Sequence, residues 1–169
     1  MKNFILSILI VLSGFFYYTD FQTNEQNTLT ENNIKLKVNY SASKTIDSDL
    51  NFFDIFINNL IVGLILSVFG FLSGGLITVV VLFWNGYILS IIYGFATKLL
   101  NYQEILYYSK HIPLEFLAFL LLSSIGFKGF LFYKKTYTQK KPDLERIPKI
   151  KEFILPIALL FIASIIETL

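Results

Sequence analysis

The sequence contains no cysteine and only one histidine, His111. Without cysteine the chain forms no disulfide and offers no thiolate metal ligand, no thiol nucleophile and no cysteine for lipid attachment. It also lacks a His-Glu-x-x-His pattern, a Gly-x-Ser-x-Gly pattern and a phosphate-binding glycine loop. The sequence patterns that usually carry the catalytic residues of proteases and ATPases are therefore missing. We expect no enzyme activity, no catalytic residue and no cofactor.

Charged residues are scarce as well. They make up 15% of the 169 residues, whereas hydrophobic residues make up 54%. The mean hydropathy of +0.61 is higher than a soluble domain of this size can accommodate. The sequence therefore predicts an all-α fold, a polytopic transmembrane helical bundle in the cell membrane. The net charge of +2 favours neither a nucleic-acid partner nor an acidic substrate.

The first 19 residues combine Lys2 with an almost unbroken apolar run. This arrangement fits either a cleaved signal peptide or a retained membrane helix. The run ends in Phe15-Phe16-Tyr17-Tyr18, where cleavage needs small residues and where a membrane helix carries interfacial aromatic residues. We therefore expect residues 1–19 to be a retained N-terminal transmembrane anchor.

Residues 20–52 are dominated by Gln, Asn, Thr, Ser, Asp and Glu and predict an extracytoplasmic polar loop. Within it, only residues 34–38 show the alternation of a short strand. The loop is too small for a catalytic domain. It suits either a contact surface or a partly ordered connector.

Residues 53–169 contain four further apolar runs, which predict a four-helix transmembrane core. The runs are Ile55–Leu72, Leu76–Thr97, Leu114–Phe130 and Phe153–Leu169. A Ser73-Gly74-Gly75 turn separates the first two, and an interfacial linker, Leu99–Lys110, precedes the third. Together with the anchor, the sequence predicts about five transmembrane helices.

Basic residues are concentrated in one segment. Between residues 128 and 152 there are eight basic residues and only three acidic ones. The basic residues are Lys128, Lys134, Lys135, Lys140, Lys141, Arg146, Lys149 and Lys151. Positive charge is retained on the cytoplasmic side, so the loop 132–152 is predicted to be cytoplasmic, with the N-terminus inside and the C-terminus outside. Membrane orientation and contact with anionic lipid explain this charge, and no nucleic-acid partner is expected.

Small residues recur at helical spacing within the core. Gly63 and Gly70 are seven residues apart, and Gly86, Ser90 and Gly94 follow at intervals of four. Small residues on one helical face allow two membrane helices to approach closely. The residues predicted to serve helix packing are Gly63, Gly70, Gly74, Gly75, Gly86 and Gly94.

Polar side chains inside apolar sequence form the candidate site. They are Asn58, Asn59, Asn85, His111, Glu115 and Glu167. Each would be costly in hydrocarbon without a partner, so they are expected to face other helices or a cavity, where they contact a partner protein or a peptide. With the topology above, all except Asn85 fall near the outer ends of their helices.

Three interpretations of this polar cluster stay open. In the one the sequence favours, His111 and Glu115, four residues apart on one helical face, form an intrahelical pair, and the amides and Glu167 join helices. In the second, the ionisable groups line a path for a proton or a peptide. In the third, His111, Glu115 and Glu167 bind zinc or another divalent ion, as in a metal-dependent membrane enzyme.

An ordered set of short motifs resembles the stage II sporulation protein M family. The set comprises Phe56-Ile-Asn-Asn59, Gly70, Gly74-Gly75, Asn85-Gly86, His111-x-x-x-Glu115, Gly126 and Ala163-Ser-Ile-Ile-Glu167-Thr168. It extends from about residue 53 to the C-terminus. The match departs at Ile112, where the family usually has glycine directly after the histidine.

The resemblance implies a non-enzymatic integral membrane subunit of a multi-protein complex in a Gram-positive bacterium. Some members act in forespore engulfment beside peptidoglycan-degrading partners. Other small members resemble proteins that accompany circular bacteriocins and assist maturation, secretion or immunity. The short length favours the second role, for which the expected partners are other integral membrane proteins, an ABC transporter, a hydrophobic precursor peptide and the lipid bilayer.

Overall fold

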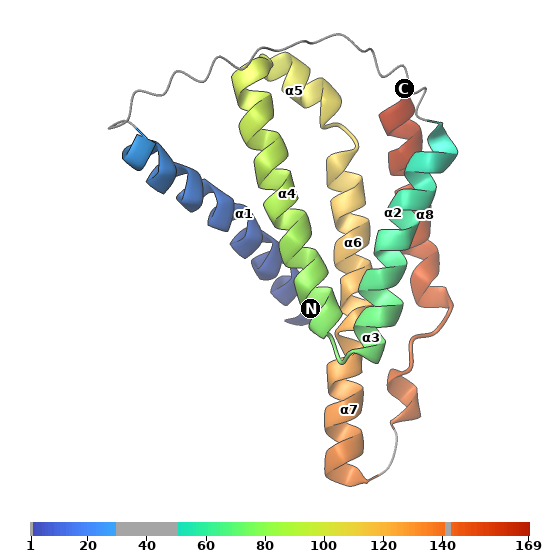
Figure 1. Ribbon diagram of the computed structural model, residues 1–169. Helices are drawn as coiled ribbons and strands as arrows, with labels where there is room; N and C mark the ends of the chain where they lie inside the picture. The colour runs from blue at the N-terminus through green and yellow to red at the C-terminus, as the bar shows by residue number, and fades with distance from the viewer. Residues whose placement is uncertain (1, 30–50, 141–142) are drawn as a thin grey trace.

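The computed structural model describes residues 2–29, 51–140 and 143–169, and all regular structure in these ranges is helical (Figure 1). The elements are α1 (Lys2–Leu29), α2 (Phe52–Leu64), a π-helical turn η1 (Ile65–Phe69), α3 (Gly70–Leu72), α4 (Leu76–Leu99), α5 (Tyr102–Tyr108), α6 (Ile112–Gly126), α7 (Lys128–Gln139), a 3-10 turn η2 (Leu144–Arg146) and α8 (Lys151–Thr168). The predicted all-α fold is confirmed.

The long helices run alternately up and down. In Figure 1, α1, α4 and α8 rise from the end where the N-terminus is marked, while α2 and α6 descend toward it. The turn after α3, α7 and η2 lie at that same end, which we call the basic end because the lysine-rich segment is there. The linker helix α5 and the C-terminus lie at the other end, which we call the polar end.

Within the described residues, three helical stretches are long and apolar enough to cross a membrane: Phe52–Leu72, Leu76–Leu99 and Ile112–Gln139. The other two expected membrane helices are weaker candidates. The apolar part of α1 covers only Asn3–Tyr17, and α8 has 18 residues, including three charged ones. The number of five crossings and the orientation therefore stay predictions. Large apolar side chains that are exposed on α4, such as Leu76 and Val80, suit contact with lipid.

Three stretches are more helical than the sequence indicates. The segment 132–152, expected to be a loop, begins as part of α7, which continues to Gln139, and it contains the 3-10 turn η2. The helix α1 continues to Leu29, past the expected end of the anchor at residue 19. The linker between α4 and α6 forms α5, because Asn101 and Glu104 make a reciprocal capping box at its start. The strand considered for residues 34–38, and most of the loop that contains it, lie outside the described residues.

The turn between α3 and α4 depends on two glycines. Gly74 and Gly75 have φ values of 64° and 92°, a left-handed conformation that residues with a Cβ rarely adopt. The Gly75 N–H donates to the Gly70 carbonyl at 2.7 Å and so closes the end of α3. The Ser73 hydroxyl accepts from the N–H of Ile77 at 3.1 Å in the first turn of α4. The short Ser-Gly-Gly sequence thus ends one helix and starts the next.

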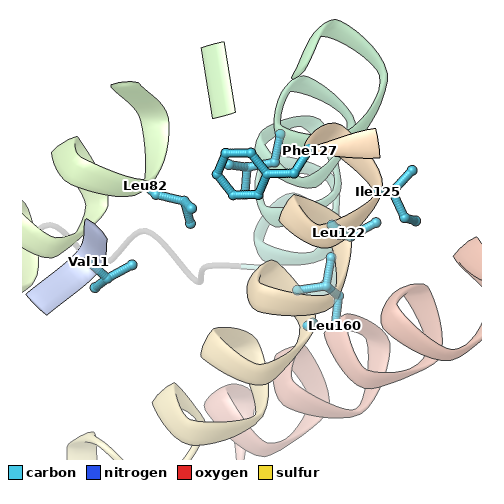
Figure 2. Packing of buried hydrophobic residues seen from close by; sticks show 8 residues of the cluster. Val11, Leu82, Leu122, Ile125, Phe127 and Leu160 are labelled. Atoms are coloured by element: carbon cyan, nitrogen blue, oxygen red, sulfur yellow. The ribbon is translucent and has the colours of Figure 1, made fainter. Parts of the chain in front are cut away.

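A small apolar core joins α1, η1, α4, α6 and α8. Its buried members are Val11, Leu66, Leu82, Ala118, Leu122, Ile125, Phe127 and Leu160. Figure 2 shows Val11 and Leu82 facing this core from α1 and α4, and Leu160 reaching it from α8 beneath Leu122. In Figure 1, α6 lies between α4 on one side and α2 and α8 on the other, and it contributes Ala118, Leu122 and Ile125 to this core.

Glycines set the closest helix crossings. A methyl group on Gly86 would collide with the Val11 carbonyl, and one on Gly14 with the Phe83 carbonyl, so α1 and α4 touch through their backbones. The same holds for Gly129, which lies against the Phe71 carbonyl. Gly63, Gly70, Gly75 and Gly86 are buried, whereas Gly74 and Gly94 are only half-buried.

The π-helical turn η1 is stabilised by a neighbouring helix. A π-helix shifts the hydrogen-bond partners by one residue and leaves room for an outside donor. Here the buried Thr78 hydroxyl of α4 donates to the Leu66 carbonyl at 2.9 Å. Gly126 of α6 packs against both groups, with no space for a methyl group between them. Leu66, Thr78 and Gly126, which we call the glycine node, thus join three helices.

Candidate functional site

The start of α6 positions two of the candidate residues. His111 occupies the N-cap, and its carbonyl accepts from the N–H groups of Leu114 and Glu115 at 3.1 and 3.3 Å. Pro113 lies in the first turn, where its missing N–H costs no hydrogen bond. His111 and Glu115 are thereby held one turn apart at the polar end. The positive end of the helix dipole stabilises negative charge on the Glu115 carboxylate.

Glu115 is joined to α2 by a hydrogen bond. The Asn59 side-chain amide donates to one Glu115 carboxylate oxygen, and both residues are half-buried. An amide donor fixes the orientation of the carboxylate and leaves its second oxygen available. The sequence predicted that an asparagine would join helices here, and the structure identifies Asn59 and Glu115 as the pair.

His111 contacts α8 rather than its own helix. Its Nε2 atom lies 3.9 Å from Oε2 of Glu167, and the two side chains are 15% and 31% exposed. Among the described residues, Glu167 is the acidic residue found within 3.9 Å of the His111 imidazole, so the contact between helices is closer than the expected His111–Glu115 pair. The i, i+4 spacing showed that His111 and Glu115 share a face, but the last turn of α8 supplies the closer partner.

The three ionisable groups nevertheless gather in one place. One ligand-type atom from each of His111, Glu115 and Glu167 lies within 4.8 Å of the other two. The nearest lysine in sequence, Lys110, points its ammonium toward the Tyr107 ring at 4.4 Å from the ring centre. Within the described ranges, neither carboxylate of this group has an ionic contact with a lysine or arginine.

Two cavities meet at His111. A smaller one, of about 230 Å³, is lined by polar groups from α2, α4 and α6 and by apolar side chains that include Phe116 and Phe119. An open cavity of about 580 Å³ is lined by His111 and Glu167, together with the tyrosines of α5 and the end of α8. The site is therefore accessible from the polar end of the bundle.

The remaining asparagines differ in position. Asn85 lines the smaller cavity, and its amide donates back to the Val81 carbonyl of its own helix at 2.7 Å. Asn58 is exposed on α2 and lines neither cavity. We use the name polar cluster below for the five residues that border the cavities: Asn59, Asn85, His111, Glu115 and Glu167.

The sequence did not single out the aromatic wall of the smaller cavity. Phe119 lies four residues after Glu115 and therefore on the same face of α6. This spacing was a usable signal, but phenylalanine is so common in apolar helices that it does not by itself indicate a binding site. The open cavity likewise includes Lys110 and Thr168, which are far apart in the sequence and are brought together by the fold.

Apolar helices long enough to cross a membrane, with a cluster of polar side chains near one end of the bundle, define the class as a helical membrane protein. The cluster contains carboxylates, amides and an imidazole, which suit binding of a donor group, a proton or a cation.

Comparison with known proteins gives the family. The family model for stage II sporulation protein M matches residues 3–169, and the chain belongs to this family. No curated protein and no solved structure matches the chain. The resemblance drawn from the short motifs is thus confirmed, and the match extends N-terminally over α1.

Proposed function

We propose that this protein is a non-enzymatic subunit of a multi-protein membrane complex that assists the maturation, secretion or immunity of a circular bacteriocin. One observation supports this role: the polar cluster borders cavities that open at one end of an otherwise apolar bundle. A hydrophobic peptide has apolar side chains and a polar backbone. The amide and carboxylate groups offer hydrogen bonds to that backbone, and the phenylalanines offer apolar contact.

A second feature supports a peptide rather than a small polar ligand. An apolar groove of about 610 Å³ lies between α1, α4 and α6. Leu89, Ile112 and Phe116 line both this groove and the smaller polar cavity, so the two are adjacent. A peptide segment that occupied the groove would place its neighbouring residues at the polar cluster.

The proposed orientation places the basic end in the cytoplasm of a Gram-positive bacterium, with the chain as a multi-pass protein of the cell membrane. Lys135 and Arg146 both contact Asp143, at 2.8 and 2.9 Å, and Lys128 contacts Glu152 at 2.6 Å. Lys134, Lys149 and Lys151 are exposed and can meet anionic lipid headgroups. The polar cluster then faces outward, where a secreted peptide leaves the membrane.

The test is a pair of substitutions in a host that carries the complete operon. Glu115→Gln and His111→Ala are expected to reduce secretion of mature peptide and recovery of the partner membrane proteins with the tagged chain. Glu104→Gln is the matched control, because glutamine preserves the capping box of α5 outside the cluster. If both cluster variants secrete mature peptide and recover the partner membrane proteins as the wild type does, the polar cluster has only a structural role.

The family match supports an alternative function in sporulation. In that case the protein acts in engulfment and its partners are peptidoglycan-degrading enzymes. Affinity purification in mild detergent from the native host, followed by mass spectrometry, separates the two roles. Recovery of an ABC transporter and a hydrophobic precursor peptide supports the bacteriocin role, whereas recovery of cell-wall hydrolases supports engulfment.

A further inference from the structure

We infer that His111, Glu115 and Glu167 form a binding site for one divalent transition-metal cation, of which zinc is the representative. The inference goes beyond the proposed role and does not depend on it. It starts from the identity of the donor atoms, since one imidazole nitrogen and two carboxylate oxygens are a ligand set that zinc and its neighbours accept.

The geometry brings these atoms to nearly the required separations. Ligands held about 2.1 Å from a tetrahedral zinc ion lie roughly 3.4 Å from one another. Here Nε2 of His111 and Oε2 of Glu167 are 3.9 Å apart, and all three ligand atoms lie within 4.8 Å of each other. Glu167 is exposed in the last turn of α8, so a change of its side-chain rotamer can close the remaining distance.

Charge balance gives an independent argument. Two carboxylates face each other beside one histidine, and no lysine or arginine of the described ranges contacts either of them. Lys110 is oriented toward the Tyr107 ring instead. Two carboxylates this close repel each other when both are ionised, and a bound divalent cation would remove that repulsion.

Asn59 provides the support that metal ligands usually have. Its amide donates to one oxygen of Glu115, which leaves the other oxygen free to bind a cation. Metal-binding carboxylates are commonly held by such outer hydrogen bonds, and removing one typically weakens metal affinity about 10- to 100-fold. His111 borders both cavities, so a fourth ligand, such as water or a peptide oxygen, has a route to the ion.

A metal at this position would also connect helices. Two of its ligands come from the first turn of α6 and the third from the end of α8, while Asn59 adds α2. The cation would therefore fix the polar end of the bundle, at the opposite end from the ion pairs of the basic end.

The test uses the full-length protein in detergent, stripped with a chelator and titrated with Zn²⁺ or with Co²⁺, whose visible spectrum reports tetrahedral ligands. We expect one metal per chain. His111→Ala and Glu167→Gln are expected to abolish stoichiometric binding, and Asn59→Ala to weaken it about 10- to 100-fold. Glu104→Gln, a carboxylate change at the same end, is expected to bind as the wild type does.

Circular dichroism of each variant shows whether the helices are retained. Glu167→Gln is the decisive variant because Glu167 is exposed and its loss leaves the core intact. Absence of stoichiometric Zn²⁺ and Co²⁺ binding in the wild type would overturn the inference. Equal affinity in the wild type and in folded Glu167→Gln would overturn it as well. Either result leaves the partner-recovery test of the proposed function unaffected.

Discussion

The glycine node permits a quantitative prediction. Replacing Gly126 with alanine adds a methyl group that collides with the Leu66 carbonyl and with the Thr78 hydroxyl. Overpacking of this kind costs about 1 to 3 kcal/mol, because backbone atoms must shift. Loss of the hydrogen bond from Thr78 to Leu66 adds about 0.6 kcal/mol, the average for an interhelical bond in a membrane protein. We expect Gly126→Ala to lower the free energy of unfolding by roughly 2 to 4 kcal/mol.

The assay is unfolding of the purified protein in mixed detergent micelles with increasing SDS, followed by circular dichroism. Gly94→Ala is the matched control. Gly94 is only half-buried in α4, and alanine favours a helix over glycine by about 1 kcal/mol. A double variant with Thr78→Ala should lose less stability than the sum of the two single variants, because one of the two colliding groups has been removed. If Gly126→Ala unfolds at the same SDS fraction as Gly94→Ala, the reasoning is wrong.

Three further predictions concern other contacts. Gly75→Ala should destabilise the protein by about 1 to 2 kcal/mol in the same assay, because φ at this position is 92°. Ser7→Ala should cost about 0.6 kcal/mol by removing the 2.7 Å hydrogen bond to Ser123, and a double-mutant cycle with Ser123→Ala should recover that coupling. The hydrogen bond from Lys135 holds the pKa of Asp143 below its usual value, with Arg146 adding to the effect. The ionised Asp143 carboxylate therefore stabilises the folded protein fully above the usual carboxyl pKa. This stabilisation is lost as the pH falls through the lowered pKa of the folded state. Thermal midpoints of the wild type and Asp143→Asn should differ at neutral pH and converge in acid, and a constant difference would contradict the assignment.

Features that depend on local chemistry were accessible from the sequence. The apolar runs predicted the helical stretch Phe52–Leu72 and the helices α4, α6 and α8 to within a few residues, because hydrocarbon requires about 20 apolar residues per crossing. The Ser-Gly-Gly turn was found because only glycine adopts its backbone angles easily. The capping box of Asn101 and Glu104 was also present in the sequence, but the tyrosine-rich segment around it was interpreted only as an interfacial linker.

Features that depend on contacts between helices were not accessible. Nothing in Ile65–Phe69 indicates a π-helix, since the donor that supports it is Thr78 of another helix. The sequence placed His111 and Glu115 on one face and favoured Glu115 as the partner of the histidine, whereas the structure brings Glu167 within 3.9 Å of it. Pairings of this kind depend on which helix faces which, and periodicity does not contain that information.

The π-helical turn sets the rotational phase of α2. It adds one residue to a helix that makes a different contact on each side of the turn. Before the turn, Asn59 donates to Glu115, and after it, Gly70 packs at the crossing with α6. Converting η1 to a regular α-helix without removing a residue would turn one half against the other by about 100°. Asn59 and Gly70 could then not both keep their partners. By absorbing one residue, the π-helical turn thus keeps two distant contacts of one helix in register.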